Sequence, residues 1–430
     1  MSLGRPSAIC GEERPQRPNL EPEPSRGRSK SHRNSAEPEF SRRMSSEVIT
    51  VSNAGAVALS LDQVIAFRLQ RHHLAERAPA KELVAVVRDV CGIQAQLGSA
   101  ARMALWARVQ GIAPDDVDRA LWEERALAKT WCMRGTVHLI PAADVPVYVA
   151  ALRQSTVAEE MRWMARYGLG SDKVQNMVAC IAECLASGPL TRRDLADCVA
   201  SSLGPEARKW IEHAWGGVVK QASLQGLVCF GPDRGQETTF ARQDRWLPGP
   251  PRQEDMATGD AGTLLMRGYL HGYGPATWQD FASWTGMPVK DTASIGRRLT
   301  DDLVEVSVEG RPGFLLREDL TAVQTAALGE PAVRLLPSFD PYLLGHGDRS
   351  HLVSDAHYKR VFRKAGWLSP VVLVNGRVAG VWSHERKGRK LMITVEPFGG
   401  LSSAACDRIG AEAEDIGRFL GLSALVKMTA

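Results

Sequence analysis

The sequence predicts a mainly helical α+β fold in which helices alternate with short strand pairs. Two observations predict it: a helix-starting motif that occurs twice, and hairpin signals in the last hundred residues. The 430 residues exceed one ordinary domain of about 100–200 residues. Hydrophobic residues make up 44% and charged residues 24%, which excludes collagen-like, membrane and disulfide-scaffold proteins.

The repeated motif is GPxTxxD, followed by Leu or Phe and then Ala. It occurs as GPLTRRDLA at residues 188–196 and as GPATWQDFA at residues 274–282. Gly-Pro ends a preceding helix, threonine caps the next one, and an aspartate three residues later can complete a capping box. We therefore expect new helices to begin at Thr191 and Thr277.

A further helix and a hairpin-like run follow each copy, LVCFGPDRGQETTFAR after the first and LVEVSVEGRPGFLL after the second. Helices followed by a strand pair are typical of winged helix-turn-helix units. A more divergent copy lies at 59–141. The sequence thus predicts three tandem winged helix-turn-helix units with β-wings, at 46–157, 158–250 and 251–330.

The first unit begins with the helical run 59–74, which has Ser60 as a possible N-cap. It ends in AKTWCMRGTVHLIPA, whose β-formers predict strand structure up to Pro141. Residues four apart on a strand share a face, so we expect Arg134 and His138 to point the same way. Contact with the DNA backbone or a flipped sugar is one interpretation, and a polar pair in the core is the other.

Residues 331–430 are predicted to form a small C-terminal α+β cap. Asn375-Gly376 is the strongest hairpin signal in the chain, and HERKGRK supplies a second, basic turn in an antiparallel meander. A closing amphipathic helix is expected at 402–422. Before the meander, a loop carries the polar residues Asp340, Tyr342, His346 and Arg349.

The remaining sequence features limit the possible functions. The chain has 53 Lys+Arg and 49 Asp+Glu, a net charge of +4 that does not by itself indicate nucleic-acid binding. Residues 1–45 are rich in Pro, Arg, Glu and Ser, so we expect a disordered extension without a catalytic role, with Met44 as a possible start and a phosphate-gripping arm as the alternative. No membrane span or signal peptide is expected. The eight cysteines lack CxxC spacing, which favours reduced buried thiols and no metal or cofactor.

Three motifs together resemble the AlkZ-like winged-helix DNA glycosylases: CGIQAQL at 91–97, WCMRGTVHLIPA at 131–142 and LLPSFDPYLLGHGDR at 335–349. The resemblance covers most of the chain from about Leu59. The resemblance implies a fold of three winged helices around a positively charged channel. It also implies the activity of this bacterial family, which removes alkylated purines and unhooks interstrand cross-links. It also implies that Gln94 and Gln96 are the catalytic residues, in the Gln–Gln form of the branch linked to antibiotic self-resistance.

The spacing of Gln94 and Gln96 constrains their surroundings. On an α-helix, residues two apart point about 200° away from each other, whereas on an extended segment they share a face. Gly92 allows the chain to leave a helix just before them. We therefore expect both glutamines at a helix break. Without the resemblance, two exposed helical glutamines are the simpler interpretation.

The expected chemistry is hydrolysis of an N-glycosidic bond. An N7-alkylated guanine is already cationic, so it leaves without a general acid, through a transition state that resembles an oxocarbenium ion. A glutamine carbonyl can position a water and stabilise positive charge on the sugar, while the amide binds phosphate or sugar oxygens. No lysine lies near the motif in the sequence, so a monofunctional enzyme without Schiff-base strand cleavage is expected.

Double-stranded DNA carrying alkylated purines is the expected partner of a monomeric, cytoplasmic, nucleoid-associated bacterial protein. The expected DNA contacts are Arg134, His138, Arg192, Arg245, Asp340, Tyr342, His346 and Arg349, with Arg349 on phosphate and Asp340 fixing its loop. A winged-helix transcriptional regulator without catalysis is the alternative, because this type of unit most often binds operators. An architectural or single-strand binder is a third, weaker option.

Overall fold

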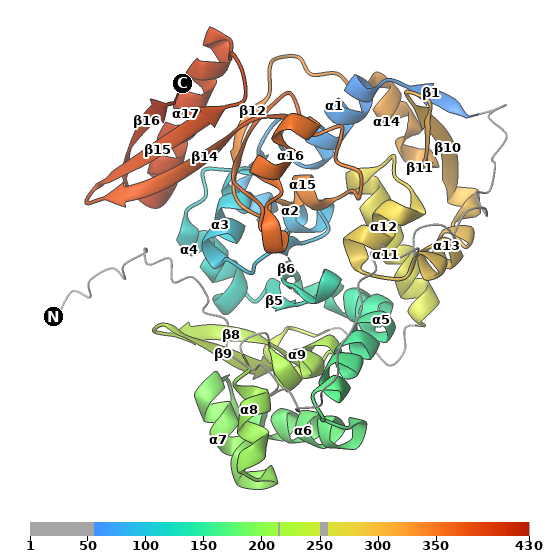
Figure 1. The fold of residues 1–430 in the computed structure, drawn as a ribbon, viewed down its shortest axis with the longest axis vertical. Helices are drawn as coiled ribbons and strands as arrows, with labels where there is room; N and C mark the ends of the chain where they lie inside the picture. The colour runs from blue at the N-terminus through green and yellow to red at the C-terminus, as the bar shows by residue number, and fades with distance from the viewer. Residues whose placement is uncertain (1–55, 214–215, 250–256, 430) are drawn as a thin grey trace, which may run out of the picture. The chain divides into compact units, whose positions relative to one another are not determined.

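One order of elements recurs three times along the chain: helix, short extended stretch, further helices, and an antiparallel strand pair (Figure 1). The computed structural model describes residues 56–213, 216–249 and 257–429. Residues 56–430 form one compact unit. The predicted disordered segment 1–45 lies outside the described residues.

The first copy contains the glutamine motif. Its elements are α2 (Leu83–Asp89), β3 (Ile93–Gln94), α3 (Gly98–Trp106), α4 (Pro114–Asp118), β5 (Leu127–Trp131) and β6 (Val137–Pro141). The sheet has the order β3-β6-β5, so β6, the second strand of the antiparallel pair, lies between β3 and β5. Helix α1 (Leu61–Arg71) precedes this copy and begins at the predicted N-cap Ser60, which forms a capping box with Gln63.

The second copy repeats the order and the sheet pattern. Its elements are α6 (Ser171–Cys184), β7 (Leu190–Thr191), α7 (Arg192–Leu203), α8 (Arg208–Ile211), α9 (Gly217–Leu224), β8 (Val228–Arg234) and β9 (Glu237–Arg242). The sheet order is β7-β9-β8. Helix α5 (Val145–Arg166) connects the first copy to the second, and α10 (Gln243–Trp246) follows the strand pair.

The third copy consists of α11 (Thr258–Tyr273), α12 (Trp278–Thr285), α13 (Val289–Arg297), β10 (Leu303–Val308) and β11 (Arg311–Leu316). Ala276 takes the place of the short first strand, because it forms an isolated bridge with Phe314 on β11. Strand β1 (Val57–Leu59) adds to the far edge of this sheet, parallel to β10. Helix α14 (Leu320–Thr325) ends the segment.

Both predicted motif caps are confirmed. Thr191 accepts a hydrogen bond from the backbone N–H of Asp194 at the start of α7. Thr277 forms a full capping box with Asp280 at the start of α12. Each such cap stabilises its helix by about 1 kcal/mol, which explains why one local motif starts equivalent helices in two copies.

The C-terminal region is a five-stranded sheet in the order β12-β13-β14-β15-β16. Its elements are β12 (Val333–Leu336), α15 (Pro341–Leu344), α16 (Asp355–Val361), β13 (Val371–Val374), β14 (Arg377–Lys387), β15 (Lys390–Pro397), α17 (Ser403–Leu420) and β16 (Ser423–Met428). The predicted turn at Asn375-Gly376 is confirmed, with φ of 48° and 74°. The predicted closing helix is α17, and the last strand β16 was not predicted.

The prediction of reduced, buried thiols is wrong for Cys406, which is exposed, and for the two cysteines of a disulfide. Cys184 at the end of α6 and Cys198 on α7 form a disulfide, with their Cα atoms 6.1 Å apart. The sequence places them 14 residues apart on two helices, and packing of α6 against α7 brings them together. Among the described residues, Cys91, Cys132, Cys180 and Cys229 are buried free thiols, as predicted.

Candidate active site

The glutamine motif lies at a break between two helices, as predicted. Helix α2 ends at Asp89, and Cys91 and Gly92 then take positive φ values of 52° and 92°. The conformation at Gly92 suits glycine because L side chains rarely adopt it. A Cβ on Gly92 would also lie 2.9 Å from Cγ2 of Ile140, so the chain passes close to strand β6 at this point.

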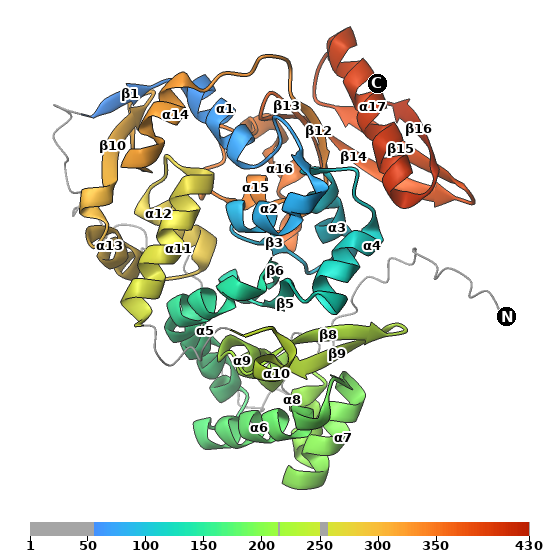
Figure 2. The same cartoon turned by 180° about the vertical axis from the view of Figure 1, so that it is seen from behind.

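After the break the chain runs extended along β6, near the middle of the view in Figure 2. Gln94 pairs with His138, and the backbone N–H of Ala95 donates to the carbonyl of Val137 at 2.7 Å. Ile93 and Ala95 are buried, whereas Gln94 is half-buried and Gln96 is exposed. This alternation places the two glutamines on the accessible face, as the extended conformation requires.

Both glutamine carbonyl oxygens are held by donors from the β5–β6 segment. Arg134 donates from Nη2 to Oε1 of Gln94 at 3.3 Å. The backbone N–H of Val137 donates to Oε1 of Gln96 at 3.1 Å. A guanidinium and a backbone N–H can only donate hydrogen bonds. The carbonyl end of each carboxamide, and not its N–H₂ end, therefore faces the protein. The N–H₂ ends of both carboxamides are turned away from these donors.

Arg134 does not lie on a strand, so the prediction that it shares a strand face with His138 is wrong. It occupies the turn Met133–Gly135 between β5 and β6, with a φ of 55°. From there Nη1 donates to the backbone carbonyl of Trp284 in the last turn of α12. Burial, and to a smaller extent the nearby charge of Arg349, lower the pKa of Arg134 to about 10, so Arg134 remains a cation at neutral pH.

His138 is buried on β6, between Gln94 and Thr130 across the sheet. Its Nδ1 lies 2.9 Å from the carbonyl of Thr136. Burial and the charge of Arg134 lower the pKa of His138 to about 3, so its ring is neutral at neutral pH. A buried ring cannot reach a duplex, so the prediction of direct DNA contact is wrong for His138 and the core alternative holds.

Comparison with known proteins identifies the family of this chain. The sequence profile described as DNA glycosylase AlkZ-like matches residues 87–419, a range that contains the whole glutamine site. The chain belongs to the AlkZ-like DNA glycosylase family. The predicted family and enzyme class are therefore confirmed.

A named protein and a solved structure from Streptomyces sahachiroi support the assignment to the AlkZ-like family. A protein named interstrand DNA cross-link repair glycosylase is 32% identical over 373 residues, which is 84% of this chain and 97% of the relative. The solved structure of Streptomyces sahachiroi DNA glycosylase AlkZ is similar, with a TM-score of 0.76 and 30% sequence identity. The similarity covers 87% of this chain and 100% of the AlkZ chain. The predicted mixture of helices and small sheets agrees with that structure.

Within this family member, three predicted DNA contacts in the C-terminal loop are buried. Asp340 has no exposed surface and pairs with Arg108, Tyr342 donates its hydroxyl to the carbonyl of Gly376, and His346 lies 3.0 Å from the carbonyl of Tyr273. The prediction of direct DNA contact is therefore wrong for Asp340, Tyr342 and His346. The prediction that Asp340 fixes the loop is confirmed, because it also caps α15 through the N–H of Tyr342.

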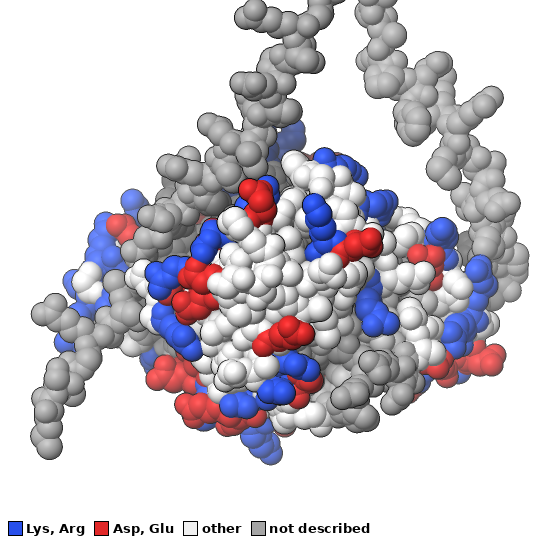
Figure 3. Space-filling model, turned by 90° about the horizontal axis from the view of Figure 1, so that it is seen from below, with Lys and Arg blue, Asp and Glu red and all other residues white. Residues whose placement is uncertain are grey.

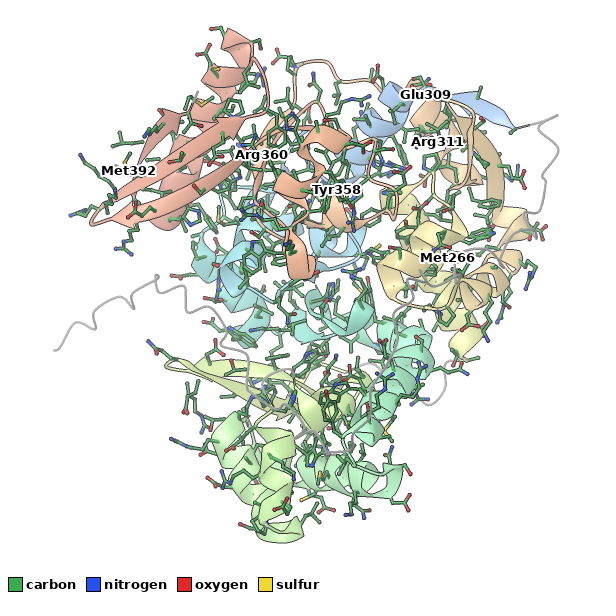
Figure 4. The ribbon with its side chains drawn as sticks, in the orientation of Figure 1. Met266, Glu309, Arg311, Tyr358, Arg360 and Met392 are labelled. Carbon is green, nitrogen blue, oxygen red and sulfur yellow. A yellow bond between two sulfur atoms is a disulfide. The ribbon has the colours of Figure 1, made fainter. Side chains whose placement is uncertain are left out.

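Arg349 is half-buried at the end of the same loop, with its guanidinium 4.4 Å from the centre of the Phe362 ring. The loop is anchored from both sides. Gly347 donates its N–H to Asp280 on α12, and Arg311 pairs with Asp348 at 2.8 Å. Arg311 lies at the turn between β10 and β11, where Figure 4 labels it. The loop thereby brings the charge of Arg349 close to Arg134.

The two arginines predicted in the second copy lie apart from the glutamines. Arg192 is half-buried and donates to the carbonyl of Ile211 at 2.8 Å, while exposed Arg245 donates to the carbonyl of Ala186 at 2.5 Å. Figure 3 views the face formed by this copy, where lysine and arginine alternate with aspartate and glutamate. Ion pairs such as Arg208–Glu212 and Lys209–Glu206 account for this mixture, so no patch of one sign covers this face.

Sequence reasoning missed a lysine beside the Arg134 turn. A Cβ on Gly135 would lie 2.7 Å from Nζ of Lys220, a residue of α9 that pairs with Glu160 on α5. Lys220 is distant from the motif in sequence, and only the packing of α9 brings it here. No group of His, Cys, Asp and Glu side chains able to hold a metal ion occurs in the described part of the chain. No helix there is long and apolar enough to cross a membrane.

Proposed function

We propose that this chain is a monofunctional DNA glycosylase that hydrolyses the N-glycosidic bond of bulky N7-alkylguanine adducts and of interstrand cross-links, in self-resistance to a DNA-alkylating natural product. The pair Gln94 and Gln96 on the accessible face next to β6 carries the proposal. The relative named for interstrand cross-link repair supports the substrate class, since it shares 32% identity over nearly its whole length.

The alkylated base supplies much of the driving force. Because an N7-alkylguanine is cationic, it departs as a neutral base once the glycosidic bond breaks, and no acid is required. The positive charge that develops on the sugar is stabilised by the lone pairs of an attacking water held on a glutamine carbonyl oxygen. This requirement suits uncharged carboxamides in a site whose neighbouring histidine is neutral.

The geometry assigns different tasks to the two ends of each carboxamide. Oε1 of Gln94 and Oε1 of Gln96 each accept one hydrogen bond from the protein, which leaves one lone pair for a water. The N–H₂ ends can donate to phosphate or sugar oxygens of the substrate strand. Glutamine is not a base, so the rate gain comes from positioning and electrostatics.

We further propose that the three recurring segments are winged helix-turn-helix units at 46–157, 158–250 and 251–330, with the C-terminal cap at 331–430. The strand orders of the first two copies, in which the second wing strand lies centrally, support this, and in the third copy the bridge of Ala276 to Phe314 lies on the matching side of β11. The proposed substrate is double-stranded DNA bound by a monomer in the bacterial cytoplasm, at the nucleoid. Arg349, whose charge acts on Arg134 beside Gln94, is the proposed phosphate contact at this site.

The test is base excision from a duplex oligonucleotide with one defined N7-alkylguanine, scored as alkali-labile abasic sites under single-turnover conditions. We expect Gln94→Ala and Gln96→Ala each to lower the excision rate by about 10²-fold, because each removes a preorganised dipole. Gln175→Ala, on the exposed face of α6, is the matched control. Unchanged rates in both site variants would remove the proposed active site.

A DNA-binding regulator is the second candidate, because helices followed by a strand pair recur three times, but membership of a glycosylase family counts against it. It predicts a footprint at one operator sequence and no base release from damaged DNA. Release of an alkylated base that depends on the glutamines rules it out. Selective operator binding by a protein that excises nothing establishes it instead.

A further inference from the structure

The carboxamide of Gln94 is held differently from that of Gln96. Gln96 is oriented by a backbone N–H of its own sheet, at Val137, and that donor remains after any substitution except proline. Gln94 is oriented by the guanidinium of Arg134, 40 residues away in the sequence. The orientation of Gln94 therefore depends on a single side chain.

Arg134 is itself fixed by the third copy of the recurring segment. Its Nη1 donates to the carbonyl of Trp284, one residue before the end of α12. The helix ends in Gly286, whose φ is 85°, and a Cβ there would lie 3.2 Å from Cα of Arg134. The missing side chain of Gly286 permits this close approach. Helix α12 therefore serves as the support against which Arg134 holds Gln94.

The carbonyl of Trp284 is a suitable anchor for a cation. Carbonyl oxygens in the last turn of a helix lack intrahelical partners and form the negative end of the helix dipole, so they attract a guanidinium. A planar guanidinium also has donors that diverge, so one arginine can bind two acceptors at once. Arg134 uses Nη1 for the helix and Nη2 for the glutamine.

We propose that Arg134 is a positioning residue for base excision, which holds the carboxamide of Gln94 between β3 and the end of α12 with its N–H₂ end toward the substrate. This inference rests on the proposed function. Without Arg134 the carboxamide of Gln94 rotates freely about its terminal torsion, because that torsion has a broad, two-fold profile. Either the carbonyl end or the N–H₂ end of the Gln94 carboxamide then faces the substrate. The group that should bind the water and the group that should bind phosphate are interchanged in part of the molecules.

The first experiment compares Arg134→Ala with the full-length protein in single-turnover excision and in binding to the same damaged duplex. Arg125→Ala is the matched control, because Arg125 also has a positive φ of 53°, is half-buried, and donates to a tryptophan carbonyl of another segment, Trp246. We expect Arg134→Ala to lower the excision rate by about 10²-fold, the effect of a misplaced reacting group, with a small change in Kd. Arg125→Ala should excise at the wild-type rate.

Two further measurements separate positioning from a merely structural role. Millimolar guanidinium should restore part of the rate of Arg134→Ala and none of the rate of Gln94→Ala. In the double variant with Gln94→Ala, loss of Arg134 should cost almost nothing more, because residues that act through one another are non-additive. Additive losses without rescue would overturn the inference.

The outcomes also distinguish this inference from the proposed function. Wild-type excision by Arg134→Ala, together with inactive Gln94→Ala, overturns the positioning role and leaves the glycosylase standing. Wild-type excision by both glutamine variants overturns the proposed site itself. If Arg134→Ala does not fold, Arg134→Lys replaces it. A folded lysine variant should excise more slowly than wild type, since an ammonium does not reproduce the divergent fork, and an unchanged rate contradicts the inference.

Discussion

Arg108 and Asp340 form an ion pair in which neither side chain has any exposed surface. Nη1 and Nη2 of Arg108 bind the two carboxylate oxygens of Asp340 at 2.8 Å and 2.7 Å. The pair joins the chain just after α3 to the loop that carries Arg349. The first recurring segment and the C-terminal region are thus joined by a buried charge pair.

Removal of one partner of this pair should strongly destabilise the protein. We expect Asp340→Ala to lower the free energy of unfolding by about 3–5 kcal/mol, because it leaves the guanidinium of Arg108 buried without its counter-charge. Urea denaturation followed by circular dichroism measures this loss. Asp348→Ala, which breaks the exposed pair with Arg311, is the control and should cost at most about 1 kcal/mol. Equal losses in the two variants would contradict the buried pair's role.

Gly92→Ala should impair both stability and excision. The substitution places a side chain at a φ of 92° and a Cβ 2.9 Å from Ile140. We expect a loss of about 1–3 kcal/mol and a lower excision rate, because the strain is relieved by moving the glutamine segment. Thermal unfolding and single-turnover excision report the two effects. Gly111→Ala has a φ of 72° but no atom within 4 Å, so it isolates backbone strain and should leave excision unchanged.

Stability should fall in mild acid because several buried histidines titrate abnormally. Burial lowers the pKa of His351 to about 3, and its Nε2 accepts a hydrogen bond from Arg68. Between about pH 6.5 and pH 3 the unfolded state binds a proton at this histidine and the folded state does not. Stability is therefore lost as the pH falls below 6.5, by about 1.4 kcal/mol per pH unit for each such group.

The comparison of His351→Gln with wild type tests this linkage. Urea denaturation between pH 5 and pH 7 should give a shallower pH dependence for the variant, by about 1.4 kcal/mol per unit. His357→Gln, at a histidine on α16 that stacks on Phe398, serves as the control and should keep the wild-type slope. Identical slopes for all three proteins would mean that His351 does not contribute.

Reduction of the Cys184–Cys198 disulfide should destabilise the second recurring segment. The bond closes a loop of 14 residues, for which chain entropy predicts about 3 kcal/mol. Thiol titration in denaturant should find two more reactive thiols after reduction than before. The melting temperature should fall on reduction, and Cys198→Ser should remove this response. Equal thiol counts before and after reduction would show that the bond does not form.

Borohydride trapping tests the proposed absence of Schiff-base chemistry. Lys220 packs against the turn that carries Arg134, but it is paired with Glu160. We expect no covalent protein–DNA adduct when excision proceeds in the presence of borohydride, because a monofunctional enzyme uses water as its nucleophile. An adduct that disappears in Lys220→Gln would establish a lyase activity and contradict the monofunctional proposal.

Local signals in the sequence predicted much of the fold. Thr191 and Thr277 start helices because a side chain reaches an N–H only three residues away, and Asn375-Gly376 forms a turn because both residues tolerate positive φ. The helix break before Gln94 follows from Gly92 in the same way. These interactions join residues that are close in the sequence, so they can be predicted without knowledge of the tertiary structure.

Contacts between residues far apart in the sequence could not be predicted, because they depend on tertiary packing. The sequence places His138 and Asp340 in motifs that suggest exposed contacts, yet neighbouring strands and helices cover both. Burial of a polar side chain depends on the element that packs over it, and a partner hundreds of residues away leaves no local signal. Arg108 and Asp340, 232 positions apart, are such a case.

Local sequence patterns specify the recurring helical motif, the glutamine pair and the extended conformation that brings both side chains to one face, since period and turn chemistry are local properties. Which end of the Gln94 carboxamide faces the protein is set by long-range packing instead. That choice requires the turn at Arg134 to meet both β3 and the end of α12, and these three elements come together only when the first and third recurring segments pack.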